Sequence, residues 1–144
     1  MAGTLYLLDT NILVHGVRMD DTGQRIKATY DLLMTQTRPL ISVVSDGELR
    51  SLAVQWAWGV AKKQQALFLL GYFVRVGIDS PDVLSAYAII DADSRRSGIK
   101  MGKNDLWIAA TAHVTGATLL TTDRDFDHLE PAFLTCERIT MTAP

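Results

Sequence analysis

Four acidic residues lie where predicted strands end or predicted helices begin, and together they could hold a metal ion. They are Asp9, Glu48, Asp105 and Asp123. Two carboxylates about 4 Å apart repel by about 4 kcal/mol at an effective dielectric of about 20, so a cluster of four needs a positive counter-charge. A divalent cation would supply it. Oxygen ligands favour Mg²⁺ or Mn²⁺ over zinc, and the three separated histidines and single cysteine have no zinc-binding spacing.

A magnesium cluster suits phosphoryl chemistry, because a bound metal can hold a phosphate and generate hydroxide from water. The chain contains no glycine-rich phosphate loop of the Walker type. The sequence therefore favours hydrolysis of phosphodiesters over hydrolysis of nucleotides.

The rest of the sequence predicts the elements that would bring these acids together. Short apolar runs predict strands, and helical periodicity with capping residues predicts helices between them. The predicted strands cover residues 4–8, 40–44, 73–77, 117–122 and 133–139. The predicted helices cover residues 21–37, 45–58, 60–70, 81–97 and 105–115. Strands separated by helices predict an α/β fold, with a central parallel sheet of four or five strands and helices on both faces.

The carboxyl ends of parallel strands share one edge of the sheet, and ligands bind beyond that edge. Asp9 and Asp123 each follow a predicted strand, and Glu48 and Asp105 fall in the first turn of a predicted helix. We therefore expect all four acids at the same edge.

Each acid, taken alone, also has a simpler structural explanation. Asp9 could cap a turn, and Asp123 could belong to a solvated loop. Ser45 and Glu48 have the spacing of a capping box, in which the glutamate bonds back to the first amide of a helix. Asp105 is favoured at a helix N-terminus by the helix dipole. Their expected convergence, rather than any one of them, supports a site.

Length and composition predict one compact domain spanning residues 1–144, with enough apolar residues for a core, at 48%. The net charge is −2, but with four acids in a metal site the other 12 acids and 14 basic residues leave +2. Charge therefore neither supports nor excludes RNA as a ligand. The single Cys136 rules out an internal disulfide, and no targeting or membrane-spanning segment is visible, so we expect a soluble cytoplasmic protein.

Four segments carry a resemblance to a known family. They are Leu8-Asp9-Thr10-Asn11, the run Ser42 to Arg50 around Glu48, the run Asn104 to Ala110, and Leu120-Thr121-Thr122-Asp123-Arg124-Asp125-Phe126. In order and spacing, the chain resembles the PIN-domain ribonucleases, most closely the VapC-type toxins of bacterial toxin–antitoxin pairs. The resemblance implies a PIN-like three-layer fold, Mg²⁺- or Mn²⁺-dependent endonuclease activity on RNA, a homodimer and a small antitoxin partner.

The same resemblance implies roles for particular residues. Metal-ligand roles fall to the four acids, and supporting polar roles near the metal fall to Asn11 and Thr121. Asp127 could support the site as a further acid, whereas Asp125 is expected to be structural or exposed. Arg50, Lys103 and Arg124 are candidates for holding the RNA backbone, with an ordinary solvated surface as the alternative. Contacts of this kind position RNA without choosing its sequence.

Three alternatives remain open from the sequence. Haloacid-dehalogenase-like phosphatases also place acids at strand ends, but they need a second aspartate where this chain has Asn11. A PIN-like binding module without catalytic activity would keep the fold alone. Finally, Trp56 and Trp58 could stack on RNA bases, although a place in the core or in a dimer interface explains them better.

Overall fold

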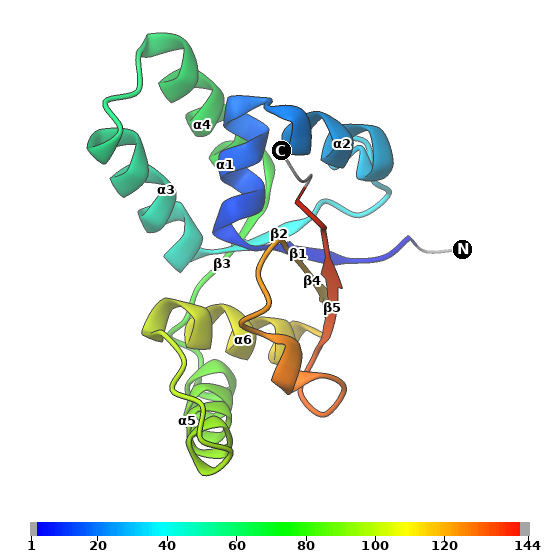
Figure 1. Cartoon of the computed structure of the whole chain (residues 1–144), viewed down its shortest axis with the longest axis vertical. Helices are drawn as coiled ribbons and strands as arrows, with labels where there is room; N and C mark the ends of the chain where they lie inside the picture. The colour runs from blue at the N-terminus through cyan, green and yellow to red at the C-terminus, as the bar shows by residue number, and fades with distance from the viewer. Residues whose placement is uncertain (1–2, 142–144) are drawn as a thin grey trace.

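The structure, a computed structural model, describes residues 3–141 and consists of a parallel sheet between two layers of helices (Figure 1). The strands are β1 Tyr6–Leu8, β2 Leu40–Ser42, β3 Val74–Val76, β4 Thr118–Thr121 and β5 Thr135–Arg138. They lie in the order β3-β2-β1-β4-β5, and all neighbouring pairs are parallel. The predicted α/β fold with a central parallel sheet is therefore confirmed.

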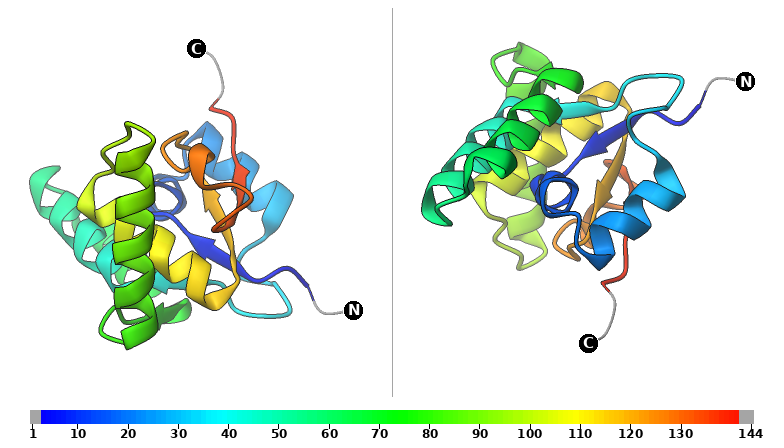
Figure 2. Two further views of the ribbon diagram at one scale, coloured as in Figure 1. Left: turned by 90° about the horizontal axis from the view of Figure 1, so that it is seen from below. Right: turned by 90° about the horizontal axis from the view of Figure 1, so that it is seen from above.

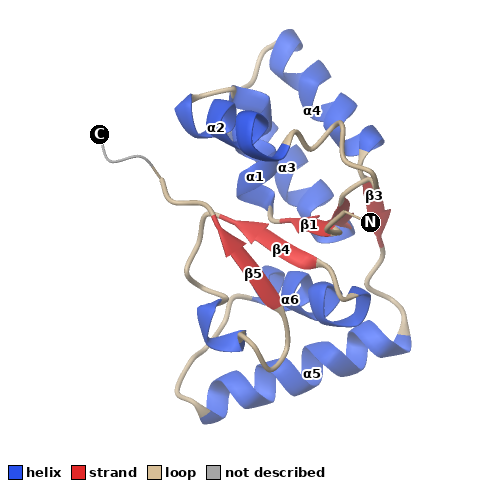
Figure 3. Cartoon of the chain, turned by 90° about the vertical axis from the view of Figure 1, so that its right-hand side faces the viewer, coloured by secondary structure: helices blue, strands red, loops and turns tan. Residues whose placement is uncertain are grey.

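Six α-helices flank the sheet. They are α1 Thr10–Arg18, α2 Asp21–Tyr30, α3 Val43–Gln55, α4 Val60–Tyr72, α5 Pro81–Arg96 and α6 Lys103–Thr115, with a short 3₁₀ helix at Asp127–Leu129. Helices α1 to α4 cover one face of the sheet, and α5 and α6 cover the other (Figure 3). Seen from below, α5 crosses in front of α6, and from above α3 and α4 lie beside α1 (Figure 2). None of the helices in the described part of the chain is long and apolar enough to cross a membrane.

The two layers are held by separate apolar cores on the two faces of the sheet. Successive strand residues point to opposite faces. Leu7 and Leu119 accordingly pack with α5 and α6, whereas Leu8 and Leu120 pack with α1, α3 and α4. All four side chains are fully buried. The central strands β1 and β4 are thus fixed from both sides, which fixes the residues that follow them.

Helix α5 has the boundaries that its capping residues predict. The Ser80 side chain accepts a hydrogen bond from the Val83 amide, and Pro81 occupies the first turn. Gly98 follows the helix with a φ of 79°, a conformation that costs glycine little. Gly116 ends α6 in the same left-handed region, as expected.

Helices α1 and α2 differ from prediction. Helix α2 ends at Tyr30 rather than near residue 37, because Asp31 adopts a left-handed conformation with a φ of 44°. Helix α1 was not predicted. Asp9 begins it by accepting a hydrogen bond from the Thr10 amide, so one residue both caps this helix and belongs to the expected site.

Two predicted caps are also wrong. The strand β2 stops early and Ser42, not Ser45, caps α3 by accepting from the Val44 amide. Glu48 is therefore not the capping-box partner of a helix that begins at Ser45. At α6 the N-cap is Gly102 rather than Asn104, so Asp105 lies in the third position of the helix instead of the first.

The contact between α1 and α2 generates a stability prediction. A Cβ atom added at Gly23 would lie 2.2 Å from the His15 carbonyl oxygen, which is backbone and cannot rotate away. We expect Gly23→Ala to lower the free energy of unfolding by about 1–3 kcal/mol, the usual cost of overpacking. Urea denaturation would measure it.

Gly71→Ala is the matched control, because Gly71 is also helical and a Cβ there meets nothing within 4 Å. It should raise the free energy of unfolding by about 0.5–1 kcal/mol, through the better helix propensity of alanine. Equal effects of the two substitutions would contradict the proposed contact.

Candidate active site

The carboxyl ends of β1 and β4 place Asp9 and Asp123 next to each other. Leu8 of β1 pairs with Leu120 of β4, and the Asp9 amide donates to the Leu120 carbonyl over 3.0 Å. After each of these two strands, the chain leaves the sheet at the same edge. Asp9 is only 3% exposed at this point, whereas Asp123 lies on the surface.

Asp9 is held by three donors. One carboxylate oxygen, Oδ1, accepts from the Thr10 amide over 2.8 Å. The other, Oδ2, accepts from the Thr121 hydroxyl over 2.7 Å and from the Asn11 side-chain amide over 3.2 Å. Burial, together with smaller contributions from the charges of Asp123 and Glu48, nevertheless raises the pKa of Asp9 to about 6. The hydrogen bonds oppose this shift without cancelling it.

Asn11 joins the two strand-end acids. Its Nδ2 donates to Oδ2 of Asp9 and to Oδ2 of Asp123, both over 3.2 Å. Its Oδ1 accepts from the Thr122 amide, which fixes the orientation of the side chain. Asn11 and Thr121, two of the three predicted supporting residues, therefore both contact the acids directly.

Glu48 reaches the same edge from α3, and its partners come from other helices. Oε1 accepts from the Thr10 hydroxyl over 2.6 Å, and Oε2 accepts from the Asn104 side-chain amide over 3.0 Å. These partners are 38 and 56 residues away along the chain. Glu48 is thus oriented by α1 and by the start of α6.

Asp105 completes the acid cluster, by which we mean Asp9, Glu48, Asp105 and Asp123. The pKa of Asp105 is raised to about 7, mainly by burial and also by the charges of neighbouring acids, which are Asp9, Asp125, Asp123 and Glu48. Burial and the charge of Asp125 also raise the pKa of Asp123. Four acids from separate segments thus share one electrostatic environment.

The donor set fits a hard divalent cation. Carboxylate, hydroxyl and amide oxygens are the ligands that Mg²⁺ and Mn²⁺ prefer, and a nearby cation would favour the ionised form of each acid. Within residues 3–141 no three His, Cys, Asp or Glu side chains are grouped so that they could hold a metal ion as they stand. Small side-chain adjustments or water ligands would therefore accompany binding, as is common for Mg²⁺.

Among the described residues, two of the predicted contributors form no hydrogen bond or ion pair with the acid cluster. Asp127 starts the 3₁₀ helix, and its charge contributes to the raised pKa of Cys136. Asp125 is the neighbouring acid whose charge helps to raise the pKa values of Asp105 and Asp123. Arg50 pairs with Asp46, one helical turn earlier. It therefore lies about 200° around α3 from Glu48, since a helix turns once in 3.6 residues.

The other two basic candidates, Lys103 and Arg124, are close in sequence to members of the cluster. Lys103 is the first residue of α6, two residues before Asp105, and Arg124 directly follows Asp123. Both side chains are exposed. Their contact with an anion at the acid cluster stays a prediction.

The two tryptophans lie at the far end of α3. Trp58 is 6% exposed and packs into the core, as predicted. Trp56 is 43% exposed, and the Arg18 guanidinium lies over its ring at 4.3 Å. Trp56 is eight residues beyond Glu48, or about 12 Å along a helix axis. Neither ring is part of the acid cluster.

Sequence reasoning missed two of the polar neighbours, Thr10 and Asn104, whereas Asp125 is exposed, as predicted, and its charge helps to raise the pKa values of Asp105 and Asp123. Thr10 and Asn104 stand beside Asp9 and Asp105 in the sequence, but both bond to Glu48, and adjacency gives no sign of that. Asp125 lies two residues after Asp123 in a loop, and this spacing alone does not predict whether its side chain points toward the cluster.

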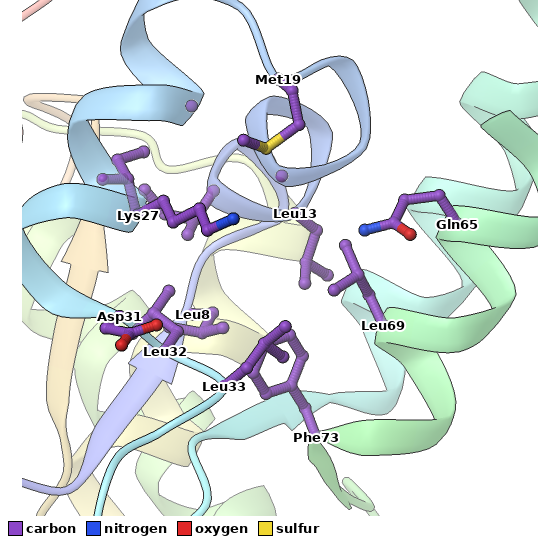
Figure 4. A pocket seen from close by; sticks show the side chains of 14 residues that line it. Leu8, Leu13, Met19, Lys27, Asp31, Leu32, Leu33, Gln65, Leu69 and Phe73 are labelled. Atoms are coloured by element: carbon purple, nitrogen blue, oxygen red, sulfur yellow. The ribbon is translucent and has the colours of Figure 1, made fainter.

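An apolar cavity of about 120 Å³ lies apart from the acid cluster, between α1, α2 and α4 (Figure 4). Leu13, Leu69 and Phe73 line it, with Lys27 and Asp31 to one side. None of the four acids borders it. The cavity offers apolar contact rather than the groups of a reaction.

The raised pKa values generate a prediction for metal-free protein. Asp105 has a pKa of about 7 when folded, against 3.8 ordinarily, so between about pH 4 and pH 7 the folded state binds more protons than the unfolded state. Its contribution to stability is present below pH 4 and lost as the pH rises through 7. Asp105→Asn should therefore raise the metal-free melting temperature at pH 8, by roughly 4 °C or more, and progressively less toward pH 4.

Asp82→Asn is the matched control, because Asp82 occupies the first turn of α5 as Asp105 does that of α6. Thermal melts in a chelator across this pH range should give parallel curves for this control and the parent. A lower melting temperature for Asp105→Asn at pH 8 would contradict the analysis.

Known proteins resemble this chain in sequence and in fold. A curated relative, ribonuclease VapC4 of Mycobacterium tuberculosis (strain ATCC 25618 / H37Rv), is 38% identical over 89 residues, covering 60% of this chain and 67% of the relative.

Two solved structures have the same fold. VapBC2 from Rickettsia felis, bound to a promoter DNA fragment, matches with a TM-score of 0.78 at 23% identity, covering 94% of this chain and 98% of the other. VapBC-5 from Mycobacterium tuberculosis, of the VapBC family of toxin–antitoxin systems, matches with a TM-score of 0.68 at 26% identity, covering 95% and 100%. The PIN domain family model matches residues 6–130, and the chain belongs to that family.

Proposed function

We propose that this chain, as a single PIN-like domain, is a metal-dependent endoribonuclease of the VapC type that hydrolyses RNA phosphodiester bonds. The observation that carries the proposal is the acid cluster, in which burial and the charges of neighbouring carboxylates raise the pKa values of Asp9 and Asp105. The chain is also 38% identical over 89 residues to a curated ribonuclease, which supports the same activity. A cluster of this kind without a cation would only weaken the fold, so its presence favours a catalytic role.

Asp9, Glu48, Asp105 and Asp123 would hold Mg²⁺ or Mn²⁺, directly or through water. A bound ion of this kind supplies hydroxide at neutral pH and stabilises charge on the scissile phosphate. Asn11 keeps Asp9 and Asp123 at a fixed separation, and Thr121 restricts the rotation of Asp9. These contacts pre-organise the acids before substrate arrives.

Lys103 and Arg124 would hold the RNA backbone on either side of the acids, since both are exposed and each is close in sequence to a member of the cluster. Arg50 is not included, because its guanidinium pairs with Asp46 and faces away from Glu48. Phosphate contacts of this kind position RNA without selecting a sequence.

The alternative functions are less well supported. A dehalogenase-like phosphatase needs a second acid where Asn11 stands, and the Asn11 amide donates to two carboxylates instead of delivering a proton to a leaving group. A silent binding module would have no use for four mutually repelling acids. Trapping a covalent aspartyl-phosphate would favour the phosphatase hypothesis over the nuclease.

We further propose that the protein is the toxin of a toxin–antitoxin pair, acts in the cytoplasm where its RNA substrate is found, and forms a homodimer. Solved relatives are toxin–antitoxin complexes, and this supports a small protein partner for the present chain.

Purified protein should cleave single-stranded RNA with Mg²⁺ or Mn²⁺ and stop when the metal is chelated. Asp105→Asn should reduce the rate by about 100-fold or more, the scale of loss for a group acting in the transition state. Asp82→Asn should cleave as the parent does. Cleavage that survives chelation, or that both variants retain, would point to a contaminating nuclease and contradict the proposal.

Induced expression should arrest bacterial growth, because an unrestrained ribonuclease depletes essential RNA. Growth curves should show arrest with the parent and with Asp82→Asn, and none with Asp105→Asn. Co-expression of a small protein encoded beside this gene should restore growth and co-purify with the chain. Arrest by Asp105→Asn equal to that by the parent would contradict a catalytic cause.

A further inference from the structure

Glu48 differs from the other members of the acid cluster in how it is held. The other acids lie beside one another along the edge of the sheet or at the start of α6, whereas Glu48 approaches from the first turns of α3. Its two carboxylate oxygens have separate donors, Thr10 on α1 and Asn104 on α6. The position of Glu48 is therefore set by residues outside its own helix.

Thr10 contacts two acids at once. Its backbone amide donates to Oδ1 of Asp9 over 2.8 Å, and its hydroxyl lies 2.6 Å from Oε1 of Glu48. The main chain of one residue thus holds the acid at the end of β1, while its side chain holds the acid of α3. This arrangement fixes the separation between Asp9 and Glu48.

A second hydroxyl stands behind the first. The Ser45 side chain is fully buried, and its Oγ lies 2.9 Å from Oγ1 of Thr10. An ionised carboxylate only accepts hydrogen bonds, and a hydroxyl carries one proton. When Glu48 is ionised, Thr10 must donate to it, and Thr10 must then accept from Ser45. The three groups form a chain with one direction, from Ser45 through Thr10 to Glu48.

We propose that Thr10, supported by Ser45, is a positioning residue that sets the orientation of the Glu48 carboxylate relative to Asp9. The inference rests on the proposed function, because it assigns the hydroxyl pair to the metal-binding geometry of the same site. Every buried side-chain nitrogen or oxygen of the described residues has a partner, so this pair is part of a satisfied network. Removing one hydroxyl leaves the others without their partners.

An ordinary packing role would predict something different. Valine has nearly the shape of threonine and is equally β-branched, so it would preserve the packing of a buried α1 residue and lose only the hydrogen bonds. Serine would keep the hydroxyl and lose a methyl group. Thr10→Val and Thr10→Ser therefore separate positioning from packing.

The experiment compares Mn²⁺ affinity by titration calorimetry with kcat and KM on a single-stranded RNA. Thr10→Val should weaken Mn²⁺ binding by about 10-fold to 100-fold, the usual effect of losing a group that orients a metal ligand. It should lower kcat and leave KM within about 2-fold, since no RNA contact is removed. Thr10→Ser should stay near the parent, and Ser45→Ala should fall between them.

Thr111→Val is the control for losing a buried threonine hydroxyl elsewhere, because Thr111 is fully buried on α6 and donates only to the Trp107 carbonyl. It should change the melting temperature and leave Mn²⁺ affinity and kcat as in the parent. Loss of Mn²⁺ affinity in this control would show that general destabilisation, rather than positioning, explains the effect.

A double-mutant cycle with Glu48→Gln tests whether Thr10 acts through Glu48. If it does, Thr10→Val should have little further effect on Mn²⁺ affinity once Glu48 is replaced, because coupled residues are not additive. Additive losses would overturn the inference, as would Thr10→Val binding Mn²⁺ like the parent, Thr10→Ser being equally impaired, or a parent that binds no Mn²⁺.

The two proposals can fail separately. A parent that cleaves RNA while Thr10→Val behaves identically refutes the positioning role and leaves the nuclease intact. A parent that binds Mn²⁺ without cleaving RNA refutes the nuclease, and the coupling between Thr10 and Glu48 in the affinity cycle would still support the positioning role.

Discussion

Repulsion among carboxylates is the constraint around which this edge of the molecule is built. Asp9 is almost fully buried and Asp105 is partly buried. The pKa of each is raised because burial removes the water that would solvate the charged form, and because neighbouring acids repel that charge. Folding brings the acids together only because other interactions offset this cost. The apolar cores on both faces of β1 and β4 supply the rigidity, and Thr121, Asn11 and Thr10 supply local hydrogen bonds.

The sheet could be predicted because its signals are local. The apolar runs end at Asp9 and Asp123, and the parallel arrangement of strands separated by helices places those ends at one edge. Helix α1 was missed because Asp9 both ends a strand and caps a helix, with no intervening loop to mark the change. Ser45 was predicted to cap α3, but β2 ends earlier than predicted, and Ser42 is the cap instead.

The contacts within the site were beyond sequence reasoning for a different reason. Glu48 bonds to Thr10 and Asn104 across 38 and 56 residues, and only the packing of α1, α3 and α6 against one another determines those pairs. Arg50 is the opposite case. Helical periodicity alone places it with Asp46 and away from Glu48, so proximity in sequence was the wrong criterion there.

The two kinds of polar neighbour have different physical consequences. Asn11 and Thr121 donate to the strand-end acids from the same edge, so they lower the cost of holding two charges that the backbone already places together. Thr10 instead links acids that the sheet alone does not bring together, and Ser45 keeps its hydroxyl directed at Glu48. A site built this way depends on the angle between α1 and α3 as much as on the strands. Disturbing that angle would separate Glu48 from Asp9 and leave the sheet unchanged.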